Sequence, residues 1–192
     1  MKFPGIPYSL LFFAAACSPT PTSLKSGPID FDRLVDEQIS QLSQRKNTLE
    51  KEAEVDGHRS DSTLVPTPET WRAELAIFRQ LGIVNKPLHQ GSYHEEGPLD
   101  DSRSNLKIRQ YVSESSPLTL LRIYYQEKIE RVRKIEGRVT ETNQLYSNQR
   151  NLTMEFDEED GKPVLTHYRI SGYQKVALRD TVRFSVEARI NW

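Results

Sequence analysis

Apolar residues in the C-terminal half of the chain recur at every second position, a pattern typical of β-strands that bury one face. The pattern is clearest at the C-terminus, where the apolar positions are Val182, Phe184, Val186, Ala188, Ile190 and Trp192. Shorter runs of the same kind begin near Asn105, and together they predict an antiparallel meander of about six strands. Residues 130–145 form one of these strands, with Gly137 expected as a β-bulge. Asp160-Gly161 and Arg179-Asp180 are expected as hairpin turns.

Helical periodicity appears in two segments nearer the N-terminus. The first segment runs from Asp30 to Gln44, where Asp30 is a suitable N-cap. Its apolar face consists of Phe31, Leu34, Val35, Ile39 and Leu42. The second segment starts at Thr67-Pro68, a cap followed by a first-turn proline, and is expected to end at Gly82. Its apolar face consists of Trp71, Leu75, Phe78 and Leu81.

Between these helices, the dipeptide Asp56-Gly57 favours a tight turn. We therefore expect an exposed hairpin built from residues 46–55 and 62–65, although a first helix that continues to Ala53 is the alternative. The fold class predicted is α+β, with one or two N-terminal helices packed on the antiparallel sheet. Trp71 and Trp192 are expected to be buried between the helices and the sheet.

The first 17 residues, MKFPGIPYSLLFFAAAC, combine one positive charge, an apolar stretch and three alanines before Cys17. Ala14-Ala15-Ala16-Cys17 resembles the lipobox of bacterial lipoproteins, although Leu is the usual residue at the position of Ala14. The alternative is an ordinary secretory signal that is cleaved near Ala16. The lipobox is favoured because the chain has a single cysteine and this cysteine follows the three alanines directly.

The resemblance implies that the Cys17 thiol carries a diacylglycerol and anchors the mature chain to a membrane. Ser18 in place of Asp implies the outer membrane of the bacterial cell envelope. The predicted organisation is a signal peptide at 1–16, a lipidated cysteine and flexible tether at 17–29, and a single α+β domain at 30–192. The tether is rich in serine, threonine and proline.

Composition narrows the function classes. The chain has 26 basic and 27 acidic residues, and this balance argues against a nucleic-acid partner. One cysteine permits neither an intrachain disulfide nor a cysteine-rich zinc site. No apolar run is long enough for a membrane-spanning helix.

Motifs for metal or cofactor binding are not evident, and we expect neither group. His89 and His94 lie beside Glu95 and Glu96, but their spacing does not match a zinc-protease helix. The acidic run 157–161 does not have the register of an EF-hand loop and is interpreted as a charged hairpin tip.

A locally basic segment, Lys128–Arg138, provides the candidate binding surface. In the strand near Asn105, Ile108 and Val112 are expected on the buried face, with Arg109 on the solvent face. We expect one polar sheet face to carry five binding residues, namely Arg109, Arg122, Tyr124, Lys134 and Arg138. Such a face suits an envelope protein, a polysaccharide or anionic lipid headgroups.

Three functions are compatible with these features. The favoured hypothesis is a membrane-anchored, non-enzymatic envelope lipoprotein that acts as a binding or assembly module. A carrier of a lipophilic ligand is the second, and it predicts an apolar cavity between the helices and the sheet. The third is a hydrolase, which requires a cleft that gathers His89, His94 or His167 with carboxylates.

Overall fold

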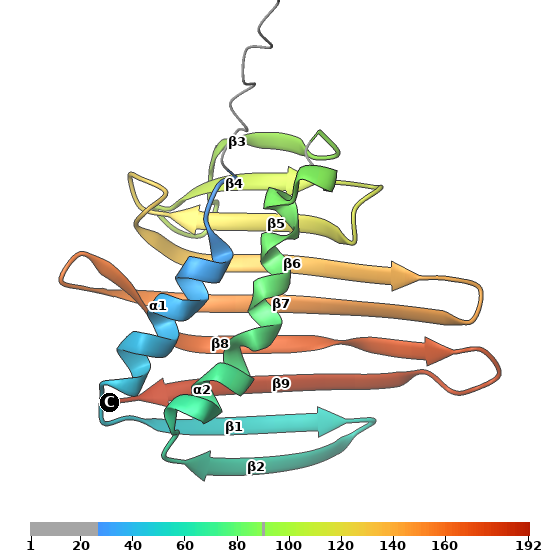
Figure 1. Cartoon of the computed structure of the whole chain (residues 1–192), viewed down its shortest axis with the longest axis horizontal. Coiled ribbons are helices and arrows are strands. Elements are labelled where there is room, and N and C mark those ends of the chain that lie inside the picture. The colour runs from blue at the N-terminus through green and yellow to red at the C-terminus, as the bar shows by residue number, and fades with distance from the viewer. Residues whose placement is uncertain (1–26, 90) are drawn as a thin grey trace, which may run out of the picture.

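The computed structural model describes residues 27–89 and 91–192, so Cys17 and the predicted signal peptide lie outside the described residues. Nine antiparallel strands form one sheet in the order β2-β1-β9-β8-β7-β6-β5-β4-β3, and helices cover one of its faces (Figure 1). The strands are β1 Thr48–Val55, β2 His58–Leu64, β3 His94–Asp100, β4 Lys107–Val112, β5 Leu118–Tyr125, β6 Val132–Thr142, β7 Tyr146–Glu159, β8 Lys162–Val176 and β9 Val182–Asn191. The helical segments are α1 Phe31–Ser43, α2 Pro68–Leu75, and the 3-10 segments η1 Ala76–Asn85 and η2 Pro87–His89.

The α+β prediction is confirmed, but the sheet has nine strands rather than about six. The predicted hairpin around Asp56-Gly57 forms, and its first strand pairs along β9 instead of remaining separate. A further strand, β3, adds to the opposite edge through β4. Both edge strands, β2 and β3, are polar and largely exposed, so they do not show the apolar alternation that marks the other strands. The alternative of a helix continuing to Ala53 is wrong.

Capping residues fix where the helices start. The side chain of Asp30 accepts a hydrogen bond of 3.0 Å from the backbone of Arg33, as expected for an N-cap. Thr67 and Thr70 form a capping box at the start of α2. The predicted end of the second helix at Gly82 is wrong. The α-helix ends at Leu75, and the chain continues as the 3-10 segment η1 to Asn85, in which Leu81 and Val84 are buried.

Gly137 does not form the predicted bulge. It lies in regular register between Leu121 on β5 and Leu152 on β7. A Cβ atom at this position would lie only 2.2 Å from Cδ2 of Leu81. The glycine therefore allows η1 to pack directly on the sheet.

Large side chains fill the space between the helices and the sheet. Trp71 is fully buried there, as predicted, and the rings of Phe78 and Tyr168 meet edge to face at 5.7 Å. A polar contact crosses this interface as well, since Glu74 on α2 accepts hydrogen bonds from Lys51 on β1 and from the hydroxyl of Tyr168. Burial, together with this contact, raises the pKa of Tyr168.

The prediction that Trp192 is buried is wrong. Its side chain follows the last residue of β9, is 48% exposed, and lies 5.5 Å from the guanidinium carbon of Arg45. The helical layer is also shorter than the central strands, which extend past it on the side of the β6–β7 and β8–β9 turns (Figure 1). Along β9, burial therefore fades from Ala188, which is fully buried, to the exposed Val182. We call this side of the sheet the overhanging end.

Candidate binding face

The face of the sheet opposite the helices has no covering layer within residues 27–89 and 91–192 (Figure 1). Antiparallel pairing aligns the polar side chains of this open face in rows that cross the strands. One row consists of Arg122, Glu136, Thr153, Arg169 and Glu187. The adjacent row consists of Tyr124, Lys134, Glu155, His167 and Arg189.

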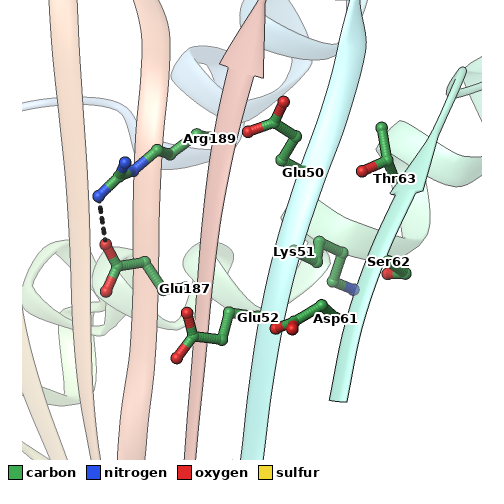
Figure 2. Close-up of a pocket in the computed structure, with 8 residues that line it drawn as sticks. All are labelled: Glu50, Lys51, Glu52, Asp61, Ser62, Thr63, Glu187 and Arg189. Atoms are coloured by element: carbon green, nitrogen blue, oxygen red, sulfur yellow. Dashed lines mark hydrogen bonds and ion pairs between the residues drawn. The ribbon is translucent and has the colours of Figure 1, made fainter. Parts of the chain in front are cut away.

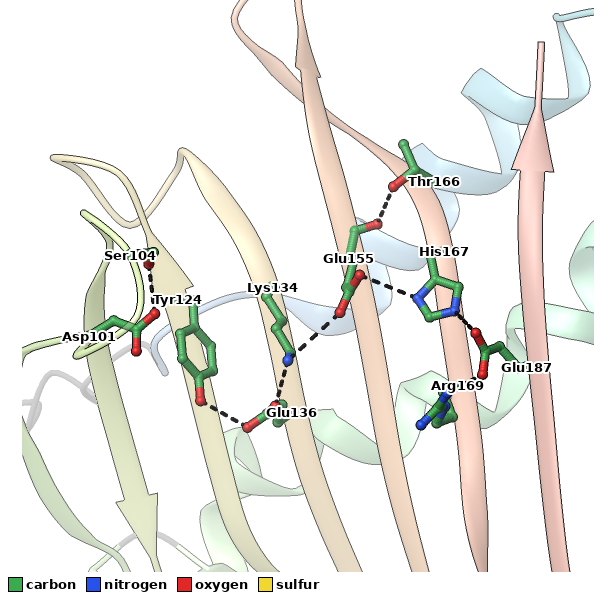
Figure 3. A network of polar contacts seen from close by, with 10 residues as sticks. All are labelled: Asp101, Ser104, Tyr124, Lys134, Glu136, Glu155, Thr166, His167, Arg169 and Glu187. Atoms are coloured by element: carbon green, nitrogen blue, oxygen red, sulfur yellow. Dashed lines mark hydrogen bonds and ion pairs between the residues drawn. The ribbon is translucent and has the colours of Figure 1, made fainter.

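Side chains of these two rows contact one another in a continuous network from β5 to β9 (Figure 3). The hydroxyl of Tyr124 donates to Oε2 of Glu136 at 2.9 Å. The Lys134 ammonium lies 2.8 Å from Oε1 of Glu136 and 3.7 Å from Oε1 of Glu155. Glu155 thereby links the lysine of β6 to the next member of the network on β8.

His167 lies between two carboxylates. Its Nδ1 atom is 3.3 Å from Oε2 of Glu155, and its Nε2 atom is 3.1 Å from Oε1 of Glu187. Glu187 also pairs with Arg169 and lies 3.4 Å from the guanidinium of Arg189. The imidazole is 20% exposed, so this part of the open face is closely packed although no layer covers it.

These contacts shift the ionisation of several groups. Burial opposes the charge on Lys134, but Glu136 and Glu155 outweigh it and raise the lysine pKa. Burial and the contact with Glu136 raise the pKa of Tyr124. The hydrogen bond from Arg169, reinforced by His167, lowers the pKa of Glu187. At neutral pH the network therefore holds fixed charges of both signs.

A shallow hollow of about 270 Å³ lies at the edge of the sheet where β9, β1 and β2 meet (Figure 2). Four carboxylates in its lining outnumber two cations, Lys51 and Arg189, and Arg189 is paired with Glu187. The carboxylates are those of Glu50, Glu52, Asp61 and Glu187. Within the described residues, no group of three or more His, Cys, Asp or Glu side chains is placed to hold a metal ion.

Four of the five predicted binding residues, Arg122, Tyr124, Lys134 and Arg138, lie on the open face. The placement of Arg109 was wrong. Arg109 pairs opposite the buried Ile123 and is in phase with the buried Tyr111, so it lies on the helix side of the sheet. Its Nε atom is 3.5 Å from Oε1 of Glu95, and burial together with Glu95 raises the pKa of Tyr111 to about 12.

The error on β4 has a simple cause. Ile108 and Val112 are the aliphatic residues of this strand, but the core uses the aromatic ring of Tyr111 instead. A tyrosine can be buried when its hydroxyl finds a partner, here Oε1 of Glu95 at 3.2 Å. The alternation of β4 predicts a strand correctly, but the residues assigned to the buried face lie on the open face.

The predicted cations do not form a patch of free positive charge. Lys134 is paired with two glutamates, and the guanidinium of Arg122 donates to Gln110. Arg138 is exposed and donates from Nε to Asn151 at 3.2 Å. The open face is thus a surface of mixed charge.

The sequence analysis named His167 with unspecified carboxylates as a requirement of a hydrolase, but it did not identify the partners Glu155 and Glu187. The alternation along β8 places His167 on the other face of the strand from Tyr168 and Ile170, which indicates that His167 faces solvent. Its partners come from β7 and β9 through strand register, which the alternation within one strand does not encode. His89 and His94 lie elsewhere, in η2 and at the start of β3.

A groove of about 920 Å³ opens at the N-terminal end of α1. It lies between α1, the end of η1 and the turns that follow β5 and β7. Phe31, Leu34 and Val132 provide apolar lining, and Arg33 and Lys162 are among its charged residues.

In the described ranges, no helix is long and apolar enough to cross a membrane. No family model, no curated protein and no solved structure matches this chain.

Proposed function

We propose that this chain is a non-enzymatic binding or assembly protein of the bacterial cell envelope, which presents the open face of its sheet to a polar partner. The observation that carries the proposal is the network from Tyr124 on β5 to Glu187 on β9, on a face that no other layer covers (Figure 3). The anchor in this proposal is an acylated Cys17, in keeping with the lipobox-like residues 14–17.

Preorganisation supports a binding role for this face. Side chains such as Lys134, Glu136 and His167 are already held by their neighbours, so they lose little conformational freedom when a partner binds. A loose array of charged side chains would have to be ordered at the expense of affinity.

The distribution of charge favours one kind of partner. Positive and negative groups lie side by side on this face, as in Lys134 with Glu155 and Arg169 with Glu187. A uniformly charged polymer would meet groups of its own sign as well as of the opposite sign, whereas a protein surface can match both signs. We therefore propose an envelope protein with a mixed-charge surface as the partner.

Native mass spectrometry of the full-length protein, gently extracted from its own envelope, tests both parts of the proposal. We expect an acyl adduct that is absent from the Cys17→Ser variant, and a bound protein that is lost in Lys134→Glu. Arg72→Glu is the matched control, because Arg72 is an exposed, paired cation on the helical layer. Absence of the adduct would overturn the anchor. A bound protein that Arg72→Glu and Lys134→Glu release equally would overturn the role of the open face.

The groove at α1 favours a second function, that of a lipid carrier. The partly exposed Ile29 and Ile129 of its lining would contact an acyl chain, whereas Phe31, Leu34 and Val132 beneath them are buried and the space deeper between the helices and the sheet is filled by core side chains. In the same mass spectrum, a carrier would retain a noncovalent lipid. Ile129→Arg, which places a charge in the groove lining, should release that lipid without removing the protein partner.

A further inference from the structure

Exposed apolar side chains gather at the overhanging end of the sheet. Five of the nine large apolar residues that are exposed in the described ranges lie there. They are Val55, Leu145, Val176, Leu178 and Val182. Patches of this kind on a soluble domain mark contact sites with proteins or membranes.

The two turns of this end form one structural unit. The backbone of Ala177, in the β8–β9 turn, donates a hydrogen bond of 2.8 Å to the carbonyl of Leu145, in the β6–β7 turn. The same contact brings Leu145 and Leu178 to the same margin of the sheet. Leu145 is 69% exposed and Leu178 is fully exposed.

Leu178 also has an unusual backbone conformation. Its φ of 62° lies in the left-handed region, which residues with bulky side chains rarely adopt. The following residue closes the turn, since the backbone of Arg179 donates to the carbonyl of Val176 at 3.1 Å. The turn therefore holds a leucine outward where a glycine or asparagine would meet the backbone requirement more easily.

Exposed cations flank Leu178 in and around the β8–β9 turn, and the carboxylate of Asp56 accepts from the backbone of Arg183 beside them. Lys175, Arg179 and Arg183 are all exposed and, within the described residues, none of them takes part in a salt bridge. Asp180 is the single carboxylate of the segment from 175 to 183. This differs from the open face, where the cations of the network are paired with glutamates.

From these observations we propose that the overhanging end docks on an anionic lipid bilayer, with Leu145 and Leu178 entering the interface and Lys175, Arg179 and Arg183 contacting lipid phosphates. Apolar side chains at the tip and unpaired cations behind them match the apolar interior and charged headgroups of a bilayer surface. The strand register supports this arrangement. Val176 and Val182 point to the helix side and Lys175 and Arg183 to the open side, so the edge that meets the bilayer carries both kinds of contact.

This docking is independent of the acyl anchor and of the partner on the open face. In a chain that also carries the acyl anchor, it adds a second contact with the membrane. It would also orient the domain, because the overhanging end then lies against the bilayer.

The first test measures binding of the full chain carrying Cys17→Ser to vesicles of phosphatidylcholine, with and without phosphatidylglycerol, by co-sedimentation. We expect binding that depends on phosphatidylglycerol and falls about tenfold or more in Leu178→Asp, since a carboxylate replaces the leucine that the bilayer would bury. Arg179→Ala should weaken the same binding about fivefold, and added salt should have a similar effect.

Val65→Asp is the matched control. Val65 is 75% exposed and lies beyond the far end of β2, at the opposite side of the sheet from the overhanging end. All variants share residues 1–26, so any contribution of that segment cancels in the comparison. Equal binding of Leu178→Asp, Val65→Asp and the parent chain would overturn the proposal.

A second measurement reports depth directly. In Leu178→Trp, lipids brominated on their acyl chains should quench the added fluorescence, whereas Val65→Trp should not be quenched. Equal quenching at both positions would overturn the proposal. Two observations together would identify a second copy of the chain as the occupant. They are dimers that depend on Leu178 in the absence of vesicles, and Leu178→Trp fluorescence that stays unquenched in their presence. This result would also overturn the proposal.

Discussion

The two faces of the nine-stranded sheet use the same strands but hold their side chains by different forces. On the helix side, residues such as Leu152 and Met154 are fully buried against other apolar groups. On the open side, Thr153 lies opposite Glu136 and Arg169, Glu155 contacts Lys134 and His167, and both residues remain partly in water. The comparison shows that alternate residues of one strand can belong to two regions with separate requirements, one for packing and one for recognition.

The largest contrast is expected between neighbouring positions of β7. Met154→Asp should prevent folding, because an unpaired carboxylate would be buried among Ile135 and Tyr168. Thr153→Asp, on the open face, should change the free energy of unfolding by no more than about 0.5 kcal/mol. Circular dichroism and denaturant unfolding of both variants measure the difference, and similar behaviour of the two would show that the assignment of the faces is wrong.

The two tryptophans should differ nearly as much. Trp71→Ala removes a fully buried ring and should cost about 3–5 kcal/mol of unfolding free energy. Trp192→Ala should cost about 1 kcal/mol or less, since its half-exposed ring loses mainly the contact with Arg45. Urea titrations of the two variants provide the values, and a cost for Trp192→Ala that equals that of Trp71→Ala would contradict its exposed position.

A smaller effect is expected where a helix meets the sheet. Gly137→Ala places a methyl group within 2.2 Å of the present position of Leu81, so it should destabilise the fold by about 1–3 kcal/mol through overpacking. The Leu81→Ala variant removes the clash. The added cost of Gly137→Ala should therefore be much smaller in that background. A double-mutant cycle measures this coupling, and simple additivity would argue against the close approach.

The smallest effect concerns the acid response of the open face. The pKa of Glu187 is lowered by Arg169 and His167 in the folded protein, so its stabilising contribution is present above the carboxyl pKa of the unfolded chain. The contribution is lost as pH falls through the lowered folded pKa. Thermal unfolding between about pH 6 and pH 3 should therefore fall more steeply for the parent chain than for Glu187→Gln. Parallel slopes would show that Glu187 does not contribute.

Several elements could be predicted from the sequence because the signal is local. Caps such as Asp30 and Thr67 and the turn at Asp160-Gly161 depend on residues a few positions apart, and the structure confirms them. The positions of β1 and β3 in the sheet are harder to predict from the sequence, since β1 buries only Leu49 and β3 buries none of its residues. Their place in the sheet is set by backbone pairing with distant strands, which leaves no apolar period to read.

The candidate binding face also has a part that the sequence predicts and a part that it does not. Arg122, Tyr124, Lys134 and Arg138 were assigned to one face correctly, because alternation within a strand determines the face. The exception, Arg109, lies on a short strand where a tyrosine replaces the expected aliphatic core residue. The contacts of His167 with Glu155 and Glu187 depend on the register of three strands, and that register comes from turns and bulges between them.

The pairing of β1 with β9 also affects the order in which the chain can assemble. Thr48 lies opposite Asn191, so the β1–β2 hairpin has no place in the sheet until the strand about 140 residues further along the chain has been made. During synthesis, β1 keeps one edge unpaired until β9 has been made, while β4 to β8 can form one hairpin at a time. Addition of β9 then closes the gap between the earliest and the latest segments in a single step. A chain truncated before Val182 would lack β9, so the edges of β1 and β8 would both be unpaired. Such a chain would be prone to aggregation or proteolysis.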